Sequence, residues 1–382
     1  MSDRSKILLF TDWYEPGFKA GGPIQSCKNF VMALHEVFDL YVLTSDRDEG
    51  DTGPYPDIPT DVWISREPGF HIYYAGLQEL DRDKIGRLIS EIAPDYIYLN
   101  SMYSYRFTVL PFLLKMRGQI TARLVLAPRG MLQEGAMQFK TWKKKLFIKL
   151  LNVAHLPREL IFQATDEQEK KDILTYFPTA GKVRIVPNFT RTGPVEWKPI
   201  RKIPGEIHCT FISRMAPKKN LLFLLDVLKD LPAGLSVTLN LYGEIVDAGY
   251  WEKCLSVIGT LPPSIRVDWK GAIPNDAVTD VLRQHHIFVL PTLGENFGHA
   301  IFEALQTGKP VLISDKTPWL DLESKQVGYD LPLEGHLFGK ALERLAAMDQ
   351  ETYDHWSLSA SRYARMIQAS PDLKDKYIEL FS

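Results

Sequence analysis

The segment HIFVLPTLGENFGHAIFEALQTGKPVLIS, residues 286–314, carries the clearest fold signal in the chain. Its apolar start, HIFVLP, predicts a buried strand, and FGHAIFEALQ predicts a helix that ends at Thr307 and Gly308. PVLIS then predicts a second buried strand. This order of strand, helix and strand predicts a parallel α/β unit. In open sheets of such units, ligands bind beyond the carboxyl ends of the strands, which here is the loop TLGEN.

The same rhythm of strand and helix extends over both halves of the chain. Strands are predicted at residues 6–10, 40–44, 71–76, 95–100, 123–128, 160–165, 183–188, 208–213, 237–243, 265–271, 286–291 and 310–314. Helices between them include 219–231 and 335–348. The alternation predicts an α/β protein with two doubly wound, Rossmann-like domains that face each other across a cleft.

The two predicted domains are separated by a segment that is rich in proline and lacks periodicity, NFTRTGPVEWKPIRKIPGE. Such a composition is typical of a linker. We therefore expect a first domain over residues 1–190, a linker over 191–206 and a second domain over 207–365. A closing helical segment follows at 366–382.

Composition and charge exclude several classes of protein. With 382 residues, 45% of them hydrophobic, the chain can bury two ordinary cores. The formal net charge of −2 gives no global basic field to suggest a nucleic-acid partner. The cysteines, Cys27, Cys209 and Cys254, form no CxxC pair, and no apolar run approaches the length of a membrane span. These features favour a cytoplasmic protein that is soluble or peripheral to a membrane.

Two carboxylates, Glu295 and Glu303, frame the start of the helix in the opening segment. We expect Asn296 to cap this helix and to leave free amide groups pointing into the cleft. These amides belong to Phe297, Gly298 and His299. Free amides and the helix dipole together favour an anion, typically a phosphate, while Glu303 could hold a pair of vicinal hydroxyls. An isolated pair of glutamates is more often simply solvated on a surface.

A basic turn follows the first predicted strand of the same domain, in SRMAPKKN at residues 213–220. Arg214 and Lys219 can both reach one point in front of that strand, with Lys218 as the solvent-facing neighbour. Two cations at one point suit a diphosphate. Taken alone, a basic turn between strand and helix is more often plain surface charge.

A glycine pair near the N-terminus forms a third element, in WYEPGFKAGGPIQSCKNF. Gly21, Gly22 and Pro23 predict a turn that opens a helix near Gln25, where backbone amides could meet a phosphate. The dinucleotide fingerprint GxGxxG and the phosphate-binding loop GxxxxGK[ST] are both absent.

Together these motifs resemble family 4 of the retaining, nucleotide-sugar-dependent glycosyltransferases, which have the GT-B fold. The resemblance rests on Gly21 with Gly22, on Arg214 with Lys219, and on E-x7-E in GENFGHAIFEAL. It extends to the VPN of VRIVPNF and to the closing helix PDLKDKYIELF, which in the family packs back onto the first domain. The resemblance implies transfer of a sugar from a nucleoside-diphosphate sugar, with UDP as the favoured nucleotide. The implied acceptor is a saccharide or lipid-linked saccharide, in cell-surface polysaccharide biosynthesis.

The resemblance also implies a role for each candidate residue. Glu295 would contact the donor sugar, Glu303 the ribose, and Arg214 and Lys219 the diphosphate. The catalytic residues so implied are Glu295, Arg214 and Lys219. The donor-binding residues so implied are Gly21, Gly22, Arg129, Ile273, Phe297, Gly298, His299 and Glu303, with the base near Gly271, Ala272 and Ile273.

Two positions depart from the family's pattern. Many members have a histidine before a glycine where this chain has Arg129 and Gly130, so Arg129 could bind a phosphate or an anionic acceptor instead. The usual glycine after the lysine of the basic pair is Asn220.

The resemblance and the chemistry of the leaving group suggest the mechanism. Two cations and a helix N-terminus can stabilise the departing diphosphate without a metal, and each preorganised charge is worth about a few kcal/mol. Retention in this family is usually explained by attack from the face of departure, so we expect no protein nucleophile and no resident cofactor. Asp46-Arg47-Asp48 and Asp81-Arg82-Asp83 match the metal-binding pattern DxD, although a loop role for the first and a helix start for the second fit better.

Rival functions remain open. A hydrolase would need its two carboxylates roughly 5 to 10 Å apart, whereas eight positions along a helix rise about 12 Å. A sugar-nucleotide epimerase on the same two-domain fold is the nearer alternative. A non-catalytic sugar-nucleotide-binding protein is the third.

A basic amphipathic segment, QFKTWKKKLFIKLLNVA at residues 138–154, suggests where an acceptor is met. Its apolar side is predicted to hold Trp142, Leu146, Phe147, Leu150 and Leu151. Its basic residues include Lys140, Lys144, Lys145 and Lys149. The segment could lie at an anionic membrane, which would place the enzyme at the inner face of the membrane. A packed helix with a solvated basic face fits the pattern equally well.

Overall fold

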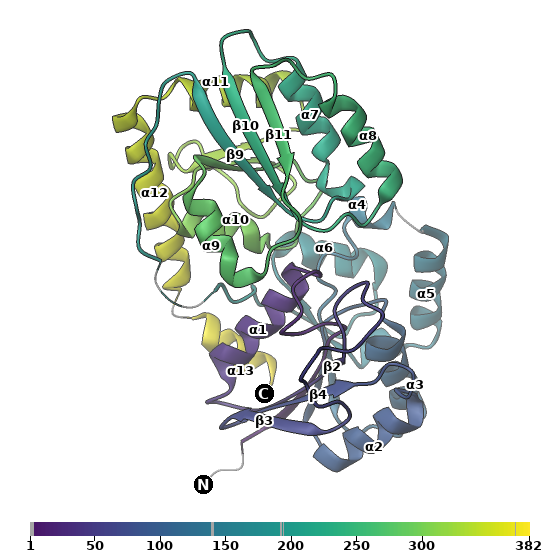
Figure 1. Ribbon diagram of the computed structural model, residues 1–382. Helices are drawn as coiled ribbons and strands as arrows, with labels where there is room; N and C mark the ends of the chain where they lie inside the picture. Colours follow the sequence, from purple (N-terminus) through teal and green to yellow (C-terminus); the bar gives the residue numbers. More distant parts are fainter. Residues whose placement is uncertain (1–3, 139–140, 192, 194, 371) are drawn as a thin grey trace. The chain divides into compact units, whose positions relative to one another are not determined.

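The computed structural model describes residues 4–138, 141–191, 193, 195–370 and 372–382 (Figure 1). Contacts divide the chain into two compact units. Unit 1 comprises Met1–Phe189 with Pro371–Ser382, and unit 2 comprises Thr190–Ser370. Residues 192 and 194 of the predicted linker and residue 371 of the predicted closing segment lie outside the described residues.

Unit 1 is built on an eight-stranded sheet, counted over the residues that are described, with the order β3-β4-β2-β1-β5-β6-β7-β8. The strands are β1 (Lys6–Phe10), β2 (Asp39–Ser45), β3 (Trp63–Glu67), β4 (Phe70–Ala75), β5 (Tyr96–Leu99), β6 (Arg123–Leu126), β7 (Ile161–Ala164) and β8 (Lys182–Ile185). All neighbouring pairs in this sheet are parallel except β3 with β4. The buried runs of β1, β5 and β6 explain why the apolar pattern located these strands.

The helices of unit 1 follow the strands in the order expected for a doubly wound sheet (Figure 1). They are α1 (Gly22–Leu34), α2 (Arg82–Ile92), α3 (Leu110–Met116), α4 (Glu134–Met137), α5 (Thr141–Val153), α6 (Glu167–Tyr176) and α13 (Leu373–Leu380). The last of these is far from the others in sequence. On α13, the buried Tyr377 stacks on Phe189 and accepts a hydrogen bond from Gln163 Nε2 at 3.0 Å. Helix α13 is therefore part of the core of unit 1.

Unit 2 is built on a six-stranded, wholly parallel sheet in its described residues, with the order β11-β10-β9-β12-β13-β14. The strands are β9 (Glu206–Ile212), β10 (Ser236–Tyr242), β11 (Ile265–Trp269), β12 (Ile287–Leu290), β13 (Val311–Ser314) and β14 (Gly328–Leu331). The helices are α7 (Leu221–Lys229), α8 (Ala248–Ile258), α9 (Asn275–Arg283), α10 (His299–Gln306), α11 (Gly335–Ala347) and α12 (Gln350–Gln368). Two parallel-stranded α/β sheets confirm the predicted fold class.

Two strands escaped the sequence prediction, β3 and β14. Strand β3, WISRE, is largely exposed at the sheet edge and pairs antiparallel with β4, with a register shift between Ser65 and Glu67. Strand β14, GYDL, is short and mixes apolar and charged residues. Edge strands are buried on fewer sides, so they lack the continuous apolar run by which the central strands were found.

Candidate active site in unit 2

The candidate residues of unit 2 gather where the strand order reverses. Strand β9 lies between β10 and β12, so the chain leaves β9 toward one side of the sheet and reaches β12 on the other. Loops that follow such adjacent strands diverge and leave a crevice at their carboxyl ends. The basic turn follows β9 and the loop TLGEN follows β12, so the fold brings these two motifs to one edge.

Hydrogen bonds fix the two loops to each other. The amide of Leu293 donates to the carbonyl oxygen of Lys218 at 2.8 Å, and the hydroxyl of Thr292 donates to the same oxygen at 3.2 Å. The amide of Glu295 donates to the carbonyl oxygen of Lys316, after β13, at 3.0 Å. Three successive strand ends are thus joined through backbone groups, which preorganises the side chains that they carry.

Lys219 and Glu295 form an ion pair at this edge. The Nζ of Lys219 lies 2.5 Å from Oε1 of Glu295, with side-chain exposures of 16% and 12%. Burial on its own would raise the pKa of Glu295, but the charges of Lys219 and Lys218 outweigh it and hold the pKa below the ordinary value. Glu295 is therefore an ionised acceptor beside a cation, a pair that can exchange partners with a ligand that offers hydroxyls and phosphate oxygens.

The turn that presents Lys219 depends on Asn220. Asn220 adopts the left-handed conformation, with φ of 59°, between the short 3-10 turn Pro217–Lys219 and helix α7. Asparagine tolerates this conformation better than most residues do, which explains how it stands where the family pattern has glycine. Arg214, half-buried, lies in the same turn after β9.

Helix α10 begins later than the sequence suggested. Its first residue is His299 and its N-cap is Gly298, with φ of 79°, so the expectation that Asn296 caps the helix was wrong. A side chain at Gly298 would strain this left-handed backbone and would lie 2.7 Å from Cδ1 of Ile301. Because only part of the E-x7-E spacing is helical, the helical-rise argument against a hydrolase loses its basis.

An aromatic group supports the loop before α10. The indole Nε1 of Trp319 donates to the carbonyl oxygen of Phe297 at 2.5 Å, and the two rings lie 5.4 Å apart. The ring of His299 lies 4.8 Å from that of Phe297, and His299 is itself buried. Trp319 therefore fixes this loop through both the ring and the carbonyl oxygen of Phe297. Sequence reasoning missed Trp319, because it lies after the following strand.

Glu303 lies in a different environment from Glu295. It is 5% exposed, and its Oε1 accepts a hydrogen bond from Nδ2 of Asn275 at 3.1 Å. Burial raises the pKa of Glu303 to about 7, against the opposing effects of Asn275 and of the positive charge of Arg191. A carboxylate with such a pKa in a buried position marks a candidate functional site.

The sequence around these residues matches a known protein family. Residues 196–329 match the family described as "Glycosyl transferases group 1". The match falls within unit 2. The matched range contains Arg214, Lys219, Glu295 and Glu303, whereas a search of curated proteins finds no match.

Solved structures share the fold of the whole chain. Sucrose-phosphate synthase from Thermosynechococcus elongatus has a TM-score of 0.73 at 15% identity, covering 99% of this chain and 98% of that one. HepE from Anabaena, solved in complex with UDP-glucose, has a TM-score of 0.69 at 16% identity, with 98% of each chain covered. WaaG, a glycosyltransferase involved in lipopolysaccharide biosynthesis, has a TM-score of 0.66 at 14% identity, covering 98% and 99%. The likeness shows the GT-B fold.

The predicted base-binding loop of unit 2 precedes α9, whose first residue, Asn275, bonds Glu303. Ile273 is half-buried against the core of unit 2, just before α9, and Asn275 begins that helix. The amide of Gly243, after β10, donates to the carbonyl oxygen of Gly271 at 2.9 Å. The carboxyl ends of β10 and β11 are therefore joined, and the Asn275 contact joins this loop to α10. Asn275 carries no motif and was not predicted.

The glycine pair lies in unit 1, at the start of α1. Gly21, with φ of 66°, is the N-cap and Gly22 is the first helical residue, so the helix begins earlier than the expected Gln25. The amides of Ile24 and Gln25 already bond the carbonyl oxygen of Gly21. Among the described residues, leaving out Gly21 and its two chain neighbours, no atom lies within 4 Å of the position that a Cβ at Gly21 would take.

Arg129 also lies in unit 1, where its guanidinium is drawn into a polar network. Its Nε donates to Oδ1 of Asn100 at 2.6 Å and its Nη2 to the hydroxyl of Tyr98 at 2.5 Å, while Nη1 bonds Asn188. These partners are neutral. The backbone of Arg129 has φ of 55°, so the residue holds a sparsely populated conformation at the end of β6.

The aspartates of the two DxD matches make local contacts. Asp48 accepts from the amides of Phe18 and Lys19 at 2.7 and 3.0 Å, and Asp46 pairs with Arg47. Asp81 caps helix α2 through the amide of Lys84. Within the described residues, no group of three or more histidine, cysteine, aspartate or glutamate side chains could hold a metal ion.

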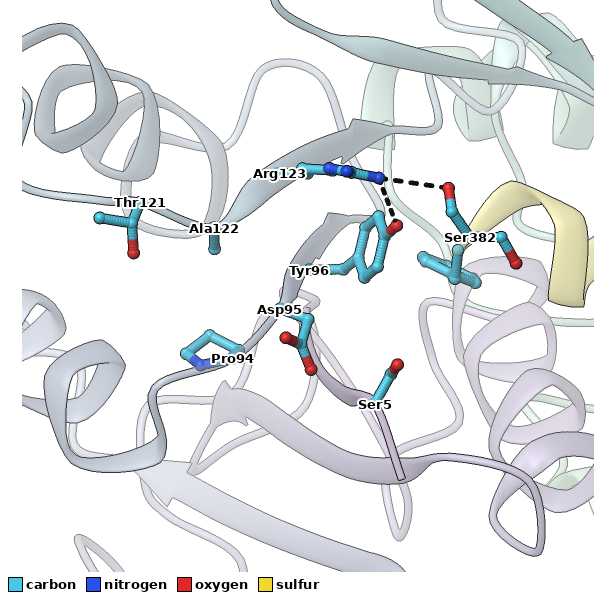
Figure 2. Close-up of a pocket in the computed structure, with 9 residues that line it drawn as sticks. Ser5, Pro94, Asp95, Tyr96, Thr121, Ala122, Arg123 and Ser382 are labelled. Carbon is cyan, nitrogen blue, oxygen red and sulfur yellow. Dashed lines mark hydrogen bonds between the residues drawn. The ribbon is translucent and has the colours of Figure 1, made fainter. Parts of the chain in front are cut away.

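One open pocket of about 450 Å³ lies elsewhere, at the amino ends of the unit 1 strands (Figure 2). Arg123 lines it and donates to the hydroxyl of Tyr96 at 2.9 Å and to the carbonyl oxygen of Ser382 at 3.2 Å. Because ligands of open α/β sheets bind at the carboxyl ends, this pocket is separate from the candidate site.

Proposed function

We propose that the protein is a retaining glycosyltransferase that moves a sugar from a nucleoside-diphosphate sugar to a saccharide or lipid-linked saccharide. The observation that carries the proposal is the Lys219–Glu295 pair, which joins a cation and an ionised acceptor at the carboxyl edge of the sheet. The match of this unit to the glycosyl transferases supports it. Transfer in cell-surface polysaccharide biosynthesis is the setting that we favour.

Each side chain receives a role in this proposal. Lys219 and Arg214 stabilise the negative charge that develops on the departing diphosphate. Glu295 accepts hydrogen bonds from hydroxyls of the transferred sugar, and Glu303 accepts from the two hydroxyls of the ribose. Gly298 and His299 offer backbone groups to sugar or phosphate oxygens, and Ile273 lies against the base. From unit 1, Gly21, Gly22 and Arg129 remain predicted contacts to phosphate or acceptor.

The donor is proposed to be a UDP-sugar. A structural relative, HepE from Anabaena, was solved with UDP-glucose, and TarM from S. aureus was solved with UDP. These relatives share the fold at low identity, so the choice of base rests on them only as support. The reaction that we propose uses no protein nucleophile and no metal: the leaving phosphate accepts the proton of the attacking acceptor hydroxyl on the face of departure.

A sugar-nucleotide epimerase remains the alternative, and the family match favours transfer over it. An epimerase would convert the nucleotide sugar without an acceptor, whereas a transferase releases the nucleoside diphosphate only as the sugar moves to a hydroxyl. Product analysis with a UDP-sugar panel, with and without a lipid-linked or free saccharide acceptor, separates the two. Acceptor-dependent UDP release with an α-linked product supports our proposal, and an epimerised nucleotide sugar without acceptor contradicts it.

Helix α5 supports a membrane-bound acceptor. Its exposed apolar residues are Trp142 (68% exposed), Leu146, Leu150 and Val153. At about 100° per residue these four lie within an arc of roughly 80°. On the other side of the helix, Ile148 and Leu151 are buried. The apolar side chains of α5, predicted to share one side, therefore divide between a packed face and an exposed face.

Lysines border the exposed face of α5. Lys143, Lys145 and Lys149 are exposed, whereas Lys144 donates to the carbonyl oxygen of Ala136 at 2.6 Å. The predicted Lys140 lies outside the described residues. An apolar stripe between cations matches the acyl boundary and the anionic headgroups of a membrane. Each described helix falls short of the length and apolar character needed to cross a membrane. We therefore propose peripheral contact at the cytoplasmic face.

Vesicle flotation tests this contact. With vesicles of phosphatidylglycerol and phosphatidylcholine, the triple variant Trp142→Ser, Leu146→Ser, Leu150→Ser should lose binding. The triple variant Lys143→Glu, Lys145→Glu, Lys149→Glu should also lose binding, and its loss relative to the wild type should be larger at low salt than at high salt. Met366→Ser, which removes an equally exposed apolar side chain from α12, is the control. Unchanged binding of both triple variants contradicts membrane contact through α5.

A further inference from the structure

The backbone carbonyl groups of Arg191 and Gly193 bond to α12 and to α10, the helix that carries Glu303. Gln368 Nε2, at the end of α12, donates to the carbonyl oxygen of Arg191 at 2.8 Å. Gln306 Nε2, three positions after Glu303 on α10, donates to the carbonyl oxygen of Gly193 at 3.0 Å. These two bonds hold the backbone of Arg191 against α12 and that of Gly193 against α10.

The side chain of Arg191 contacts α9, the helix that also carries Asn275. Its Nη1 donates to the hydroxyl of Thr279 at 3.0 Å. Thr279 lies four positions after Asn275, hence on the same face of α9 and one turn away. Asn275 in turn donates to Glu303. The guanidinium is thus anchored one helical turn from the amide that holds the carboxylate.

A buried carboxylate needs a positive charge if it is to act as an anion. Glu303 is almost fully buried, and its named hydrogen-bond partner Asn275 is neutral. A buried unpaired charge is costly, so such a group takes up a proton instead. A protonated carboxyl group gives up acceptor capacity, whereas an ionised one can accept from two vicinal hydroxyls at once. Arg191 is a cation that acts on Glu303, and it lowers the carboxyl pKa against the effect of burial.

We propose that Arg191 is a positioning residue for the nucleotide: its guanidinium, anchored on Thr279 one turn from Asn275, favours the ionised form of Glu303 that accepts the ribose hydroxyls. This inference rests on the proposed function, because it takes Glu303 as the ribose contact. In this proposal Arg191 acts through Glu303 and is held in place by Thr279, so it is expected to affect nucleotide binding rather than the transfer step.

A double-mutant cycle tests the inference, with UDP as the calorimetric probe and with ADP and GDP tested alongside it. Four proteins are compared with the wild type: Arg191→Gln, Arg191→Lys, Glu303→Gln and the double variant Arg191→Gln, Glu303→Gln. Arg266→Gln, which removes an exposed arginine from β11, is the control. Thermal unfolding of each variant verifies that it is folded.

We expect Arg191→Gln to weaken UDP binding by roughly five- to tenfold and Arg191→Lys to stay within about twofold of the wild type, because charge is what Glu303 needs. In the Glu303→Gln background, Arg191→Gln should have little further effect. With a donor sugar, Arg191→Gln should raise KM and leave kcat nearly unchanged.

Three results overturn the inference alone: wild-type affinity in Arg191→Gln, equal loss in Arg191→Lys, or a full loss that persists when Glu303 is already glutamine. Two other results overturn the proposed function as well. These are wild-type affinity in Glu303→Gln and failure of the wild-type protein to bind UDP, ADP or GDP.

Discussion

The loop after β12 and the helix α10 that follows it each carry one glutamate, and the two side chains are held in opposite ways. Glu295, in the loop, is paired with Lys219 at 2.5 Å, and the lysine charges keep its pKa low. Glu303, in the helix, has the neutral Asn275 as its hydrogen-bond partner, and burial raises its pKa to about 7. The motif E-x7-E thus joins a permanently charged group and a group poised near neutrality.

The contrast between Glu295 and Glu303 shows that the position of a glutamate in a motif does not determine its electrostatic role. Glu295 shares its cation with the place where a diphosphate is proposed to bind, so a ligand can rearrange that pair as charge develops. Glu303 is buried on α10, where Asn275 of α9 holds its carboxylate in place as an acceptor. We therefore expect Glu295 to matter most in the transition state and Glu303 to matter equally for the bound ground state and transition state.

The largest expected effect comes from removing the shared cation. Lys219→Ala should lower kcat by about 10²–10³-fold and weaken UDP binding, because a charge-assisted contact to the leaving group is lost. Steady-state kinetics and calorimetry measure both quantities. Lys229→Ala, an exposed lysine at the other end of α7, is the control. Near-wild-type turnover in Lys219→Ala would remove the basis for the leaving-group assignment.

Glu295→Ala should depress turnover by roughly 10- to 100-fold while sparing the affinity for UDP, which lacks the sugar. The reason is that contacts to the sugar ring strengthen as charge develops at its anomeric carbon. Calorimetry with UDP and kinetics with the UDP-sugar are run on the same preparation. If UDP affinity falls as far as turnover does, Glu295 serves the nucleotide and the contrast with Glu303 is lost.

Glu303→Ala should weaken UDP and the UDP-sugar alike, by roughly tenfold, since hydrogen bonds to a charged group are worth about 1.5–3 kcal/mol at most. KM should rise and kcat should change little. A variant that loses kcat but keeps its affinity for UDP would reverse the two roles.

The last expected effect is on stability: Glu295 and Glu303 should change the unfolding free energy over different pH ranges, which can be measured without a ligand. The folded pKa of Glu303 is raised, so its stabilising contribution is complete below the unfolded value and is lost as pH rises toward about 7. Relative to Glu303→Gln, the wild type should therefore lose about 2–3 kcal/mol of unfolding free energy between pH 5 and pH 8. The folded pKa of Glu295 is lowered, so its contribution is lost only as pH falls below the ordinary carboxyl range. Urea unfolding of both glutamine variants across pH checks this, and parallel profiles would contradict it.

Much of this site follows from local sequence. The strands β9 and β12 are continuous apolar runs, and the turns after them carry Lys219 and Glu295, so parallel-sheet topology is enough to predict that they meet. The start of α10 was misplaced because Gly298 adopts a left-handed conformation, which a polar neighbour such as Asn296 does not reveal.

The surroundings of Glu303 could not be predicted in the same way. Asn275 and Arg191 come from separate segments with no motif, and their approach depends on how α9 packs on α10. Arg129 shows the same limit in unit 1, where its contacts with Tyr98, Asn100 and Asn188 depend on the sheet order. Tertiary packing, rather than spacing in sequence, determines these environments.

The most direct test of the central claim is a crystal structure of the protein with UDP bound. The account predicts ribose hydroxyls within about 3 Å of the Glu303 carboxylate and phosphate oxygens at that distance from Lys219 or Arg214. It also predicts that the carboxylate of Glu295 stays clear of the nucleotide. UDP bound with its ribose on Glu295, or bound away from the carboxyl edge of β9 and β12, would contradict the account.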